Sequence, residues 1–357
     1  MKYAALHLSV TDDCDFACSY CYRSVAGASM SERVAEIAVS AFVPRLRNGG
    51  CIVFYGGEPL LRFDLMKSVV ERARFEARRA GRRVRFALTT NGNRAGEDVI
   101  AFLEENRFGV ELSFDGSAQD VQRAAGSEAR LRALIARLLE RKRVRLETNS
   151  VFTCDSVGRL GETLEGIVDS GVSGAHYGLS YLRPWTEDAV AIFGRELARL
   201  RRAAVRRFKT TGTIPFVNFR LDAPSRIRYC SAGQDRVAVD PHGGIWGCAV
   251  LGDWARGPAG RGRGRCFKMG SIAVRGPEHF RSNIKLGSNY ESLAQDRFSS
   301  PDGRCHSCPD VDHCWVCPVS AALAGGAPGR IPGFVCALQK VKAREARRFV
   351  AGSGWTK

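Results

Sequence analysis

Cys14-Asp-Phe-Ala-Cys18-Ser-Tyr-Cys21 is the stretch that decides the fold of this chain. An apolar run over 4–10 leads into it and predicts a strand that ends just before the cysteines. Three thiolates at this CxxxCxxC spacing can hold three irons of a [4Fe–4S] cube and leave the fourth iron open. A structural zinc site would need a fourth ligand, and the nearest histidine, His7, lies within the predicted strand. The spacing therefore favours a cluster with an open iron over a zinc knot or chance clustering.

Short β-branched segments alternate with amphipathic ones from the N-terminus to about residue 210. The segments that predict strands are 4–10, 51–55, 84–90, 110–115, 144–153 and 175–182. The segments that predict helices are 31–47, 64–80, 96–106, 128–142, 156–170 and 187–209. This alternation predicts an α/β fold with a parallel sheet. The six units favour a partial (β/α)6 barrel over an open sheet.

The composition changes after about residue 215, where Gly is frequent and helical periodicity is scarce. This tail carries eight of the 13 cysteines. Since the N-terminus shows no signal-sequence pattern, clustered cysteines indicate metal or iron–sulfur ligation rather than disulfides. We therefore expect a barrel over 1–215 and a small cysteine-rich domain over 216–357, with one helix near 336–350.

Glycines and polar residues follow the predicted strands, at the edge where parallel α/β folds form their sites. The second strand ends in Tyr55-Gly56-Gly57-Glu58-Pro59. Its glycines let a ligand approach the backbone, and Glu58 can accept hydrogen bonds from an ammonium group. The third strand ends in Thr89-Thr90-Asn91-Gly92, which is also an ordinary turn sequence. Behind a cysteine triad, these motifs favour a binding site.

The triad, with an aromatic residue before its last cysteine, and the Gly-Gly-Glu sequence resemble the motifs of the radical SAM superfamily. In that family the open iron chelates S-adenosylmethionine (SAM), whose reductive cleavage yields a 5′-deoxyadenosyl radical that removes a hydrogen atom from the substrate. The cluster ligands that the resemblance implies are Cys14, Cys18 and Cys21. The SAM contacts that it implies here are Tyr20, Gly56, Gly57 and Glu58.

The fourth strand and the segment after it supply further implied SAM contacts. Ser113 would lie near the SAM ribose or carboxylate, and Asp115 either binds SAM or caps the following turn. Arg123 lies in a stretch that resembles the family's DxxR sequence, where it would pair with the SAM carboxylate or remain a solvated helical arginine. Cys154, which ends the fifth strand, has a catalytic or a structural role, and Cys51 predicts a small buried side chain.

The cysteines of the tail resemble the SPASM domain, an extension that binds two auxiliary [4Fe–4S] clusters. The one departure from its pattern is that two residues, rather than three, separate Cys314 from Cys317. The first auxiliary cluster would use Cys230, Cys248 and Cys317. The second would use Cys305, Cys308, Cys314 and Cys336. The fourth position of the first cluster is left to Cys266 or to an open iron. With the triad, the resemblance implies three [4Fe–4S] clusters.

The net charge of +17 allows a nucleic-acid or acidic-peptide partner, but solvated arginines on helix faces explain it more simply. No RNA-binding module is recognisable, so we do not expect a nucleic-acid partner. The Arg-Gly run Ala255–Arg265 predicts a surface loop, with a binding loop as the alternative. No apolar run is long enough to span a membrane, and we expect a soluble, cytoplasmic protein.

Radical SAM enzymes with SPASM domains most often modify ribosomally made peptides (RiPP maturation), so the resemblance implies an oxidoreductase that crosslinks or similarly oxidises a precursor peptide. Because the chain begins at the first strand, we expect a separate protein or the SPASM surface to recognise the peptide. A flavodoxin or ferredoxin would supply electrons. Formylglycine-forming relatives have Asp after the cysteine matching Cys248, where this chain has Ala249. The alternatives are a small-molecule substrate, formylglycine formation, or a non-enzymatic iron–sulfur carrier, which needs no SAM site.

Overall fold

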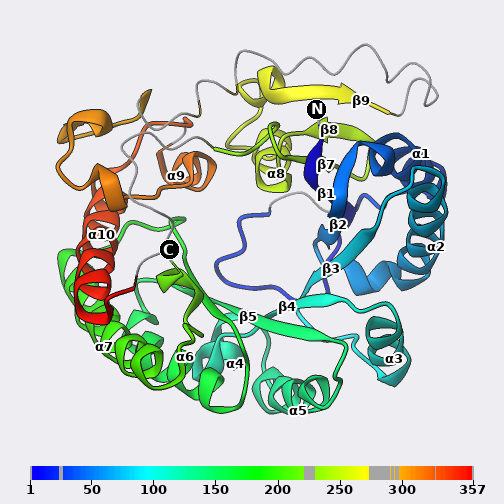
Figure 1. Ribbon diagram of the computed structural model, residues 1–357. Coiled ribbons are helices and arrows are strands. Elements are labelled where there is room, and N and C mark those ends of the chain that lie inside the picture. Colours follow the sequence, from blue (N-terminus) through cyan, green and yellow to red (C-terminus); the bar gives the residue numbers. More distant parts are fainter. Residues whose placement is uncertain are drawn as a thin grey trace.

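The computed structural model describes residues 2–23, 27–220, 230–272, 290, 293, 297–325 and 327–355. Within these residues nine strands form one sheet, in the order β6-β5-β4-β3-β2-β1-β7-β8-β9. Its consecutive parallel strands are β1 (Tyr3–Thr11), β2 (Leu46–Gly56), β3 (Val84–Thr90), β4 (Gly109–Ser113), β5 (Arg145–Phe152) and β6 (Ala175–Leu179). They curve around the centre of the molecule (Figure 1). The predicted partial barrel is confirmed.

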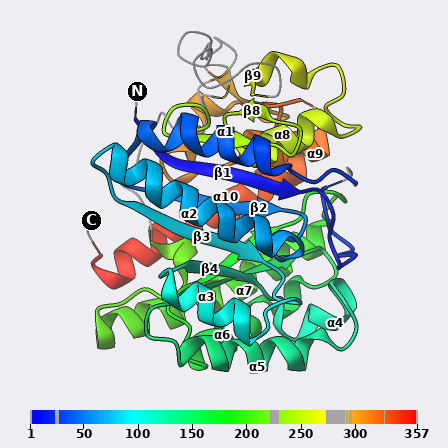
Figure 2. The ribbon, with the colours of Figure 1, turned by 90° about the vertical axis from the view of Figure 1, so that its right-hand side faces the viewer.

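Helices cover the outer face of these strands (Figures 1 and 2). They are α1 (Glu32–Phe42), α2 (Phe63–Arg79), α3 (Glu97–Glu105), α4 (Gln119–Gln122), α5 (Ser127–Leu139), α6 (Leu160–Asp169) and α7 (Glu187–Thr211). Leu6, Leu8 and Val10 alternate along β1 and are fully buried, so the main apolar core lies on the strand face that carries these residues. Pro44 lies in the single turn Val43–Arg45 that follows α1, because proline cannot continue a helix. The predicted helix 31–47 therefore ends early.

The C-terminal region extends the same sheet. Its strands are β7 (Arg236–Val239), β8 (Gly244–Trp246), β9 (Lys268–Ser271) and the separate pair β10 (Ser299–Ser300) and β11 (Gly303–Arg304). Its helices are α8 (Ala249–Arg256), α9 (Pro318–Gly325) and α10 (Gly333–Ser353). Since β7 pairs in parallel with β1, the sheet runs across the predicted boundary near residue 215. The single predicted helix corresponds to α10, and α8 and α9 were not predicted.

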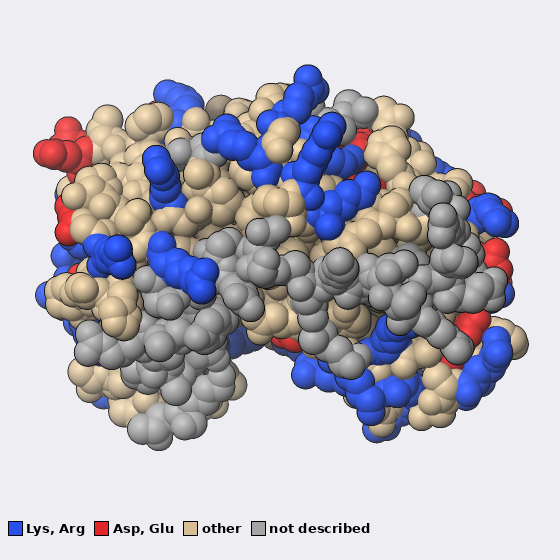
Figure 3. All heavy atoms as spheres, turned by 90° about the horizontal axis from the view of Figure 1, so that it is seen from above, with Lys and Arg blue, Asp and Glu red and all other residues tan. Residues whose placement is uncertain are grey.

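Basic side chains are spread over the face seen from above, with few acidic ones between them (Figure 3). Arg261 and Arg265, from the Arg-Gly run, and the neighbouring Lys268 are exposed. Other arginines form ion pairs on helix surfaces, such as Arg199 with Glu165 at 3.2 Å. That pairing supports the simpler explanation of the charge. No helix in the described ranges has both the length and the apolar character that a membrane crossing requires.

Candidate active site

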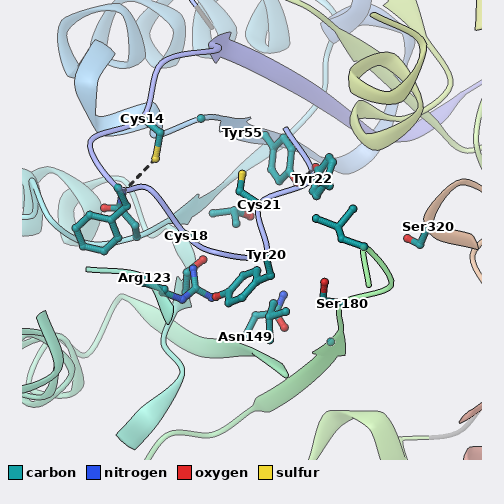
Figure 4. A pocket seen from close by; sticks show the side chains of 18 of the residues that line it. Cys14, Cys18, Tyr20, Cys21, Tyr22, Tyr55, Arg123, Asn149, Ser180 and Ser320 are labelled. Atoms are coloured by element: carbon teal, nitrogen blue, oxygen red, sulfur yellow. Dashed lines mark hydrogen bonds between the residues drawn. The ribbon is translucent and has the colours of Figure 1, made fainter. Parts of the chain in front are cut away.

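A cavity of about 280 Å³ opens at the carboxyl ends of the parallel strands (Figure 4). The cysteine triad lies in its wall, with Cys14, Cys18 and Cys21 all among the lining residues. Ser180, just after β6, and Ser320 of α9 also line it. The cavity therefore joins the loop after β1 to the strand ends and to a helix of the C-terminal region.

Hydrogen bonds to the turn after β3 hold the loop that carries the triad. The Asp15 carboxylate accepts hydrogen bonds from the side chains of Asn91 at 2.9 Å, Asn93 at 2.7 Å and Arg94 at 3.0 Å. Although burial opposes it, these bonds hold the pKa of Asp15 below its ordinary value. Asn91 Nδ2 also lies 3.7 Å from Cys14 Sγ (Figure 4). The Thr-Thr-Asn-Gly turn thus positions the triad.

Gly56 and Gly57 leave room for the backbone that enters this loop. A Cβ on Gly56 would lie 2.3 Å from the Thr11 carbonyl oxygen, and one on Gly57 would lie 2.0 Å from that of Asp13. The Gly57 N–H donates to the Thr11 carbonyl at 2.8 Å. Any side chain here would displace the triad loop. Both glycines line the cavity, and their contact with SAM stays a prediction.

Glu58 is fully buried and is not among the residues that line the cavity. Its carboxylate accepts hydrogen bonds from the Thr90 hydroxyl at 2.7 Å, the Asn91 N–H at 2.7 Å and the Leu60 N–H at 3.0 Å. Burial raises the pKa of Glu58 to about 7, although these bonds lower it. The carboxylate ties the end of β2 to the end of β3, and its bond to the SAM amino group stays a prediction.

The raised pKa of Glu58 predicts a pH-dependent contribution to stability. Because the folded pKa of about 7 exceeds the ordinary 4.5, the contribution is complete below pH 4.5 and is lost as the pH rises through 7. We expect the difference in unfolding free energy between wild type and Glu58→Gln to change by on the order of 3 kcal/mol across this range. Denaturant titration of the cluster-free protein at several pH values measures it. A constant difference would contradict the prediction.

Asp115 and Arg123 form a buried ion pair beside Tyr20. Arg123 Nε and Nη2 donate to the two carboxylate oxygens at 2.9 and 3.0 Å, and the Tyr20 hydroxyl donates to the same carboxylate. The Tyr20 ring centre lies 5.3 Å from the guanidinium carbon (Figure 4). Asp115 makes no side-chain cap, and Arg123 is buried rather than solvated. Tyr20, Arg123 and Ser113 line the cavity, and their contacts with SAM stay predictions.

Breaking this ion pair should destabilise the fold. Asp115→Ala would leave the Arg123 charge buried without a partner, which costs roughly 3–5 kcal/mol. The control is Glu128→Ala, which breaks an exposed pair with Arg132 at 2.8 Å and should cost less than about 1 kcal/mol. Denaturant unfolding measures both. Equal losses in the two variants would show that burial of the Asp115 pair has no energetic consequence.

Two polar side chains that the motifs did not identify, Glu111 and Asn149, also line the cavity. Among its described lining residues, Glu111 has the one carboxylate. Burial raises the pKa of Glu111, while the side chains of Asn149 and Thr89 lower it through hydrogen bonds. Glu111 stands two residues before Ser113 on β4, so the alternation of a strand could have placed it on the same face.

The seven cysteines of the C-terminal pattern line two further cavities. One, of about 320 Å³, is lined by Cys230, Cys248 and Cys317. The other, of about 390 Å³, is lined by Cys305, Cys308, Cys314 and Cys336. The grouping matches the two implied ligand sets despite the shorter spacing before Cys317. Burial raises the pKa of Cys248 and of Cys314 to about 12, so metal binding must release their protons.

The three remaining cysteines line none of these cavities. Cys266 is exposed on the short helix η6 (Gly264–Phe267), where its Sγ lies 3.2 Å from the Arg263 carbonyl oxygen. Cys154 is half-buried, with its Sγ 3.6 Å from Asp155 Oδ1. Cys51 is half-buried in β2. The structure therefore does not place Cys154 in the wall of the triad cavity, nor Cys266 in the wall of the first auxiliary cavity.

A buried network of four charges joins the triad loop to α8. Arg23 bonds Asp12 at 2.6 Å and also bonds Asp253. Arg256 bonds Asp12 at 2.7 Å and Asp253 at 2.9 Å. Both carboxylates are at most 4% exposed. Since α8 begins directly after Cys248, the network fixes the triad relative to the first auxiliary cavity.

The donor sets suit clusters better than single ions. In the described part of the chain, no three His, Cys, Asp or Glu side chains converge closely enough to hold one metal ion. In an iron–sulfur cluster each thiolate binds its own iron, so ligands spread around a cavity fit this arrangement. The triad would hold the SAM-binding cluster, and the two C-terminal sets would hold the auxiliary ones.

Comparison with known proteins finds relatives of this chain in sequence and in structure. Residues 8–170 match the family model of the radical SAM superfamily. A GTP 3′,8-cyclase of Pasteurella multocida is 32% identical over 120 residues, which are 32% of this chain and 34% of the cyclase. The uncharacterized protein MJ0907 of Methanocaldococcus jannaschii is 24% identical over 258 residues, which are 69% of this chain and 85% of that protein. The chain thus matches only about a third of the cyclase.

Solved structures share the fold over nearly the whole chain. Native anSMEcpe with bound AdoMet and Kp18Cys peptide has a TM-score of 0.77 at 15% identity, covering 98% of this chain and 99% of that one. Streptococcus suis SuiB bound to precursor peptide SuiA has a TM-score of 0.60 at 14% identity, covering 94% and 76%. The predicted radical SAM domain is confirmed over residues 8–170, and the solved structures show that the chain shares their fold. The fold expected for the cysteine-rich region is confirmed with it.

Proposed function

We propose that this radical SAM enzyme oxidises a peptide and uses three [4Fe–4S] clusters to do so. The observation that carries the proposal is the position of Tyr55, which lines both the triad cavity and the first auxiliary cavity. One tyrosine thus lies between the place where a hydrogen atom would be removed and a place that can take up an electron. Burial raises the pKa of Tyr55 to about 12, so it stays neutral there.

Bound to the triad cluster, SAM supplies a 5′-deoxyadenosyl radical after one-electron cleavage. The chain's own residues shape the space around it. Tyr20 closes one side and is held in place by Asp115 and Arg123. Gly56 and Gly57 give the ligand access to the backbone, and Ser113 offers a hydroxyl at the end of β4. These are the residues that we propose to contact SAM. Glu58 holds the ends of β2 and β3 together beside them.

A net two-electron oxidation requires the substrate to lose a hydrogen atom, then one electron and one proton. The hydrogen atom would go to the 5′-deoxyadenosyl radical that bound SAM supplies. Tyr55 lies where the electron would pass toward the cysteines that would hold the first auxiliary cluster. The proton would go to Glu111, the carboxylate in the cavity wall, because burial raises its pKa and so strengthens it as a proton acceptor.

A peptide is the proposed substrate because α9 and the segment after β6 form part of the wall, through Ser320, Leu323 and Leu182. Both structural relatives were solved with peptides bound. The sequence match to a GTP cyclase favours a small molecule as the second candidate. Formylglycine formation, a separate leader-recognition protein, a flavodoxin or ferredoxin as reductant, and a cytoplasmic location stay predictions.

The test is to incubate the anaerobically reconstituted enzyme with SAM and dithionite, with either a synthetic peptide library or GTP. We expect a peptide to lose the mass of two hydrogen atoms, with one 5′-deoxyadenosine formed per event. Turnover of GTP with no change in any peptide would move the assignment to the small-molecule candidate. SAM cleavage with neither product would refute both.

A further inference from the structure

The first auxiliary cavity offers three thiols, whereas a [4Fe–4S] cluster with full protein ligation has four ligands. Two of them stand at helix starts. Cys248 Sγ accepts the Leu251 N–H at 3.3 Å at the start of α8, and Cys317 Sγ accepts the Ser320 N–H at 3.5 Å at the start of α9. Helix N-termini favour negative charge, so both positions suit a metal-bound sulfur. The question is what takes the fourth position.

Cys266 stands outside the wall of this cavity. It is exposed, sits on η6 and is absent from the residues that line this cavity. The cavity wall contains another side chain with a suitable donor atom, which is His7 of β1.

His7 is held in the middle of the sheet and faces the cavity. Its backbone lies between Val53 of β2 and Ala238 of β7. Leu6 and Leu8 on either side are fully buried in the core, so strand alternation turns His7 to the opposite face. No hydrogen bond to its ring is found within the described ranges. His7 is half-buried, and it lines the same cavity as Cys230, Cys248 and Cys317.

We infer that His7 is the fourth ligand of the first auxiliary cluster, through a ring nitrogen. Histidine replaces cysteine in some iron–sulfur centres, where it raises the reduction potential. A neutral imidazole in place of a thiolate makes the cluster less negative by one charge, so it accepts an electron more readily. This suits a cluster that receives the electron of an oxidised substrate. The inference rests on the proposed cluster at Cys230, Cys248 and Cys317.

Pulsed EPR of the dithionite-reduced full-length protein tests it, with ordinary and with 15N-labelled histidine. We expect a nitrogen hyperfine coupling that changes with the label and disappears in His7→Ala. His7→Cys is the second variant, needed in case His7→Ala misfolds. Its thiolate can replace the imidazole as the cluster ligand. It should keep about twelve irons per chain, lose the nitrogen coupling and show a lower reduction potential.

Two controls should keep the coupling. They are Cys266→Ala and His176→Ala, since His176 lies on β6 and pairs with Glu147 at 3.1 Å. A wild-type protein without the coupling, or a coupling that survives in His7→Cys, overturns the inference. Counting iron separates this from failure of the proposed function. About eight irons in the wild type would remove the cluster itself, whereas about twelve irons without coupling would reject His7 alone.

Discussion

Replacing Cys14, Cys18 and Cys21 together by Ala should abolish reductive cleavage of SAM and lower the iron content from about twelve to about eight per chain. The three thiols share one cavity with the strand-end residues proposed to bind SAM. Their loss therefore removes the SAM-binding cluster and leaves the cysteines of the C-terminal region unchanged. Anaerobic reconstitution, iron determination and a 5′-deoxyadenosine assay measure the two effects on the same sample.

Cys51→Ala is the matched control for this variant. Cys51 is half-buried in β2 and lines none of the three cysteine cavities, so iron and cleavage should stay at wild-type values. About four irons in the wild type with cleavage intact would mean that the C-terminal cysteines hold no clusters. A wild type without cleavage and with zinc in the tail would contradict the proposed chemistry altogether.

The barrel could be predicted from the sequence because its signals are local. Each parallel strand is a short apolar run between polar segments, and period-two burial is visible in Leu6, Leu8 and Val10. The motifs also lie at strand ends, where the topology of parallel sheets brings them together. Cys14 and Gly57 thus come to one cavity although 43 residues separate them in the chain.

The contacts between distant segments could not be predicted, because the local sequence pattern does not indicate which charged side chains will pair. Asp115 and Arg123 each suggested a contact with SAM, and the structure pairs them with one another. Arg256 belongs to the Arg-Gly run, which predicted a surface loop, yet it ends α8 in a buried network with Asp12. The helices α8 and α9 escaped prediction because each is only eight residues long.

His7 is another residue whose neighbours could not be predicted from the local sequence. In the sequence analysis His7 is a residue of the first predicted strand and no obvious fourth ligand for the triad. The pairing of β1 with β7 brings the C-terminal region to the same sheet, and His7 then lines a cavity with cysteines more than 200 residues away in the chain.

Single substitutions in the two auxiliary sets should separate SAM cleavage from substrate oxidation. Cys248→Ala and Cys336→Ala each remove one ligand from a different cavity, so each should lower the iron content by about four per chain. SAM cleavage should persist in both, since the triad is untouched. Peptide oxidation should be lost in Cys248→Ala, because the cluster that Tyr55 borders is the proposed acceptor of the substrate electron.

Cys266→Ala is the control, because its thiol is exposed and outside both cavities. It should keep about twelve irons and full peptide oxidation. The ratio of oxidised peptide to 5′-deoxyadenosine is the decisive measurement, since it falls only when radicals form without a path for the second electron. If Cys248→Ala keeps the wild-type ratio while losing its four irons, the electron leaves the substrate by another route, and the position of Tyr55 between the two cavities has no part in the reaction.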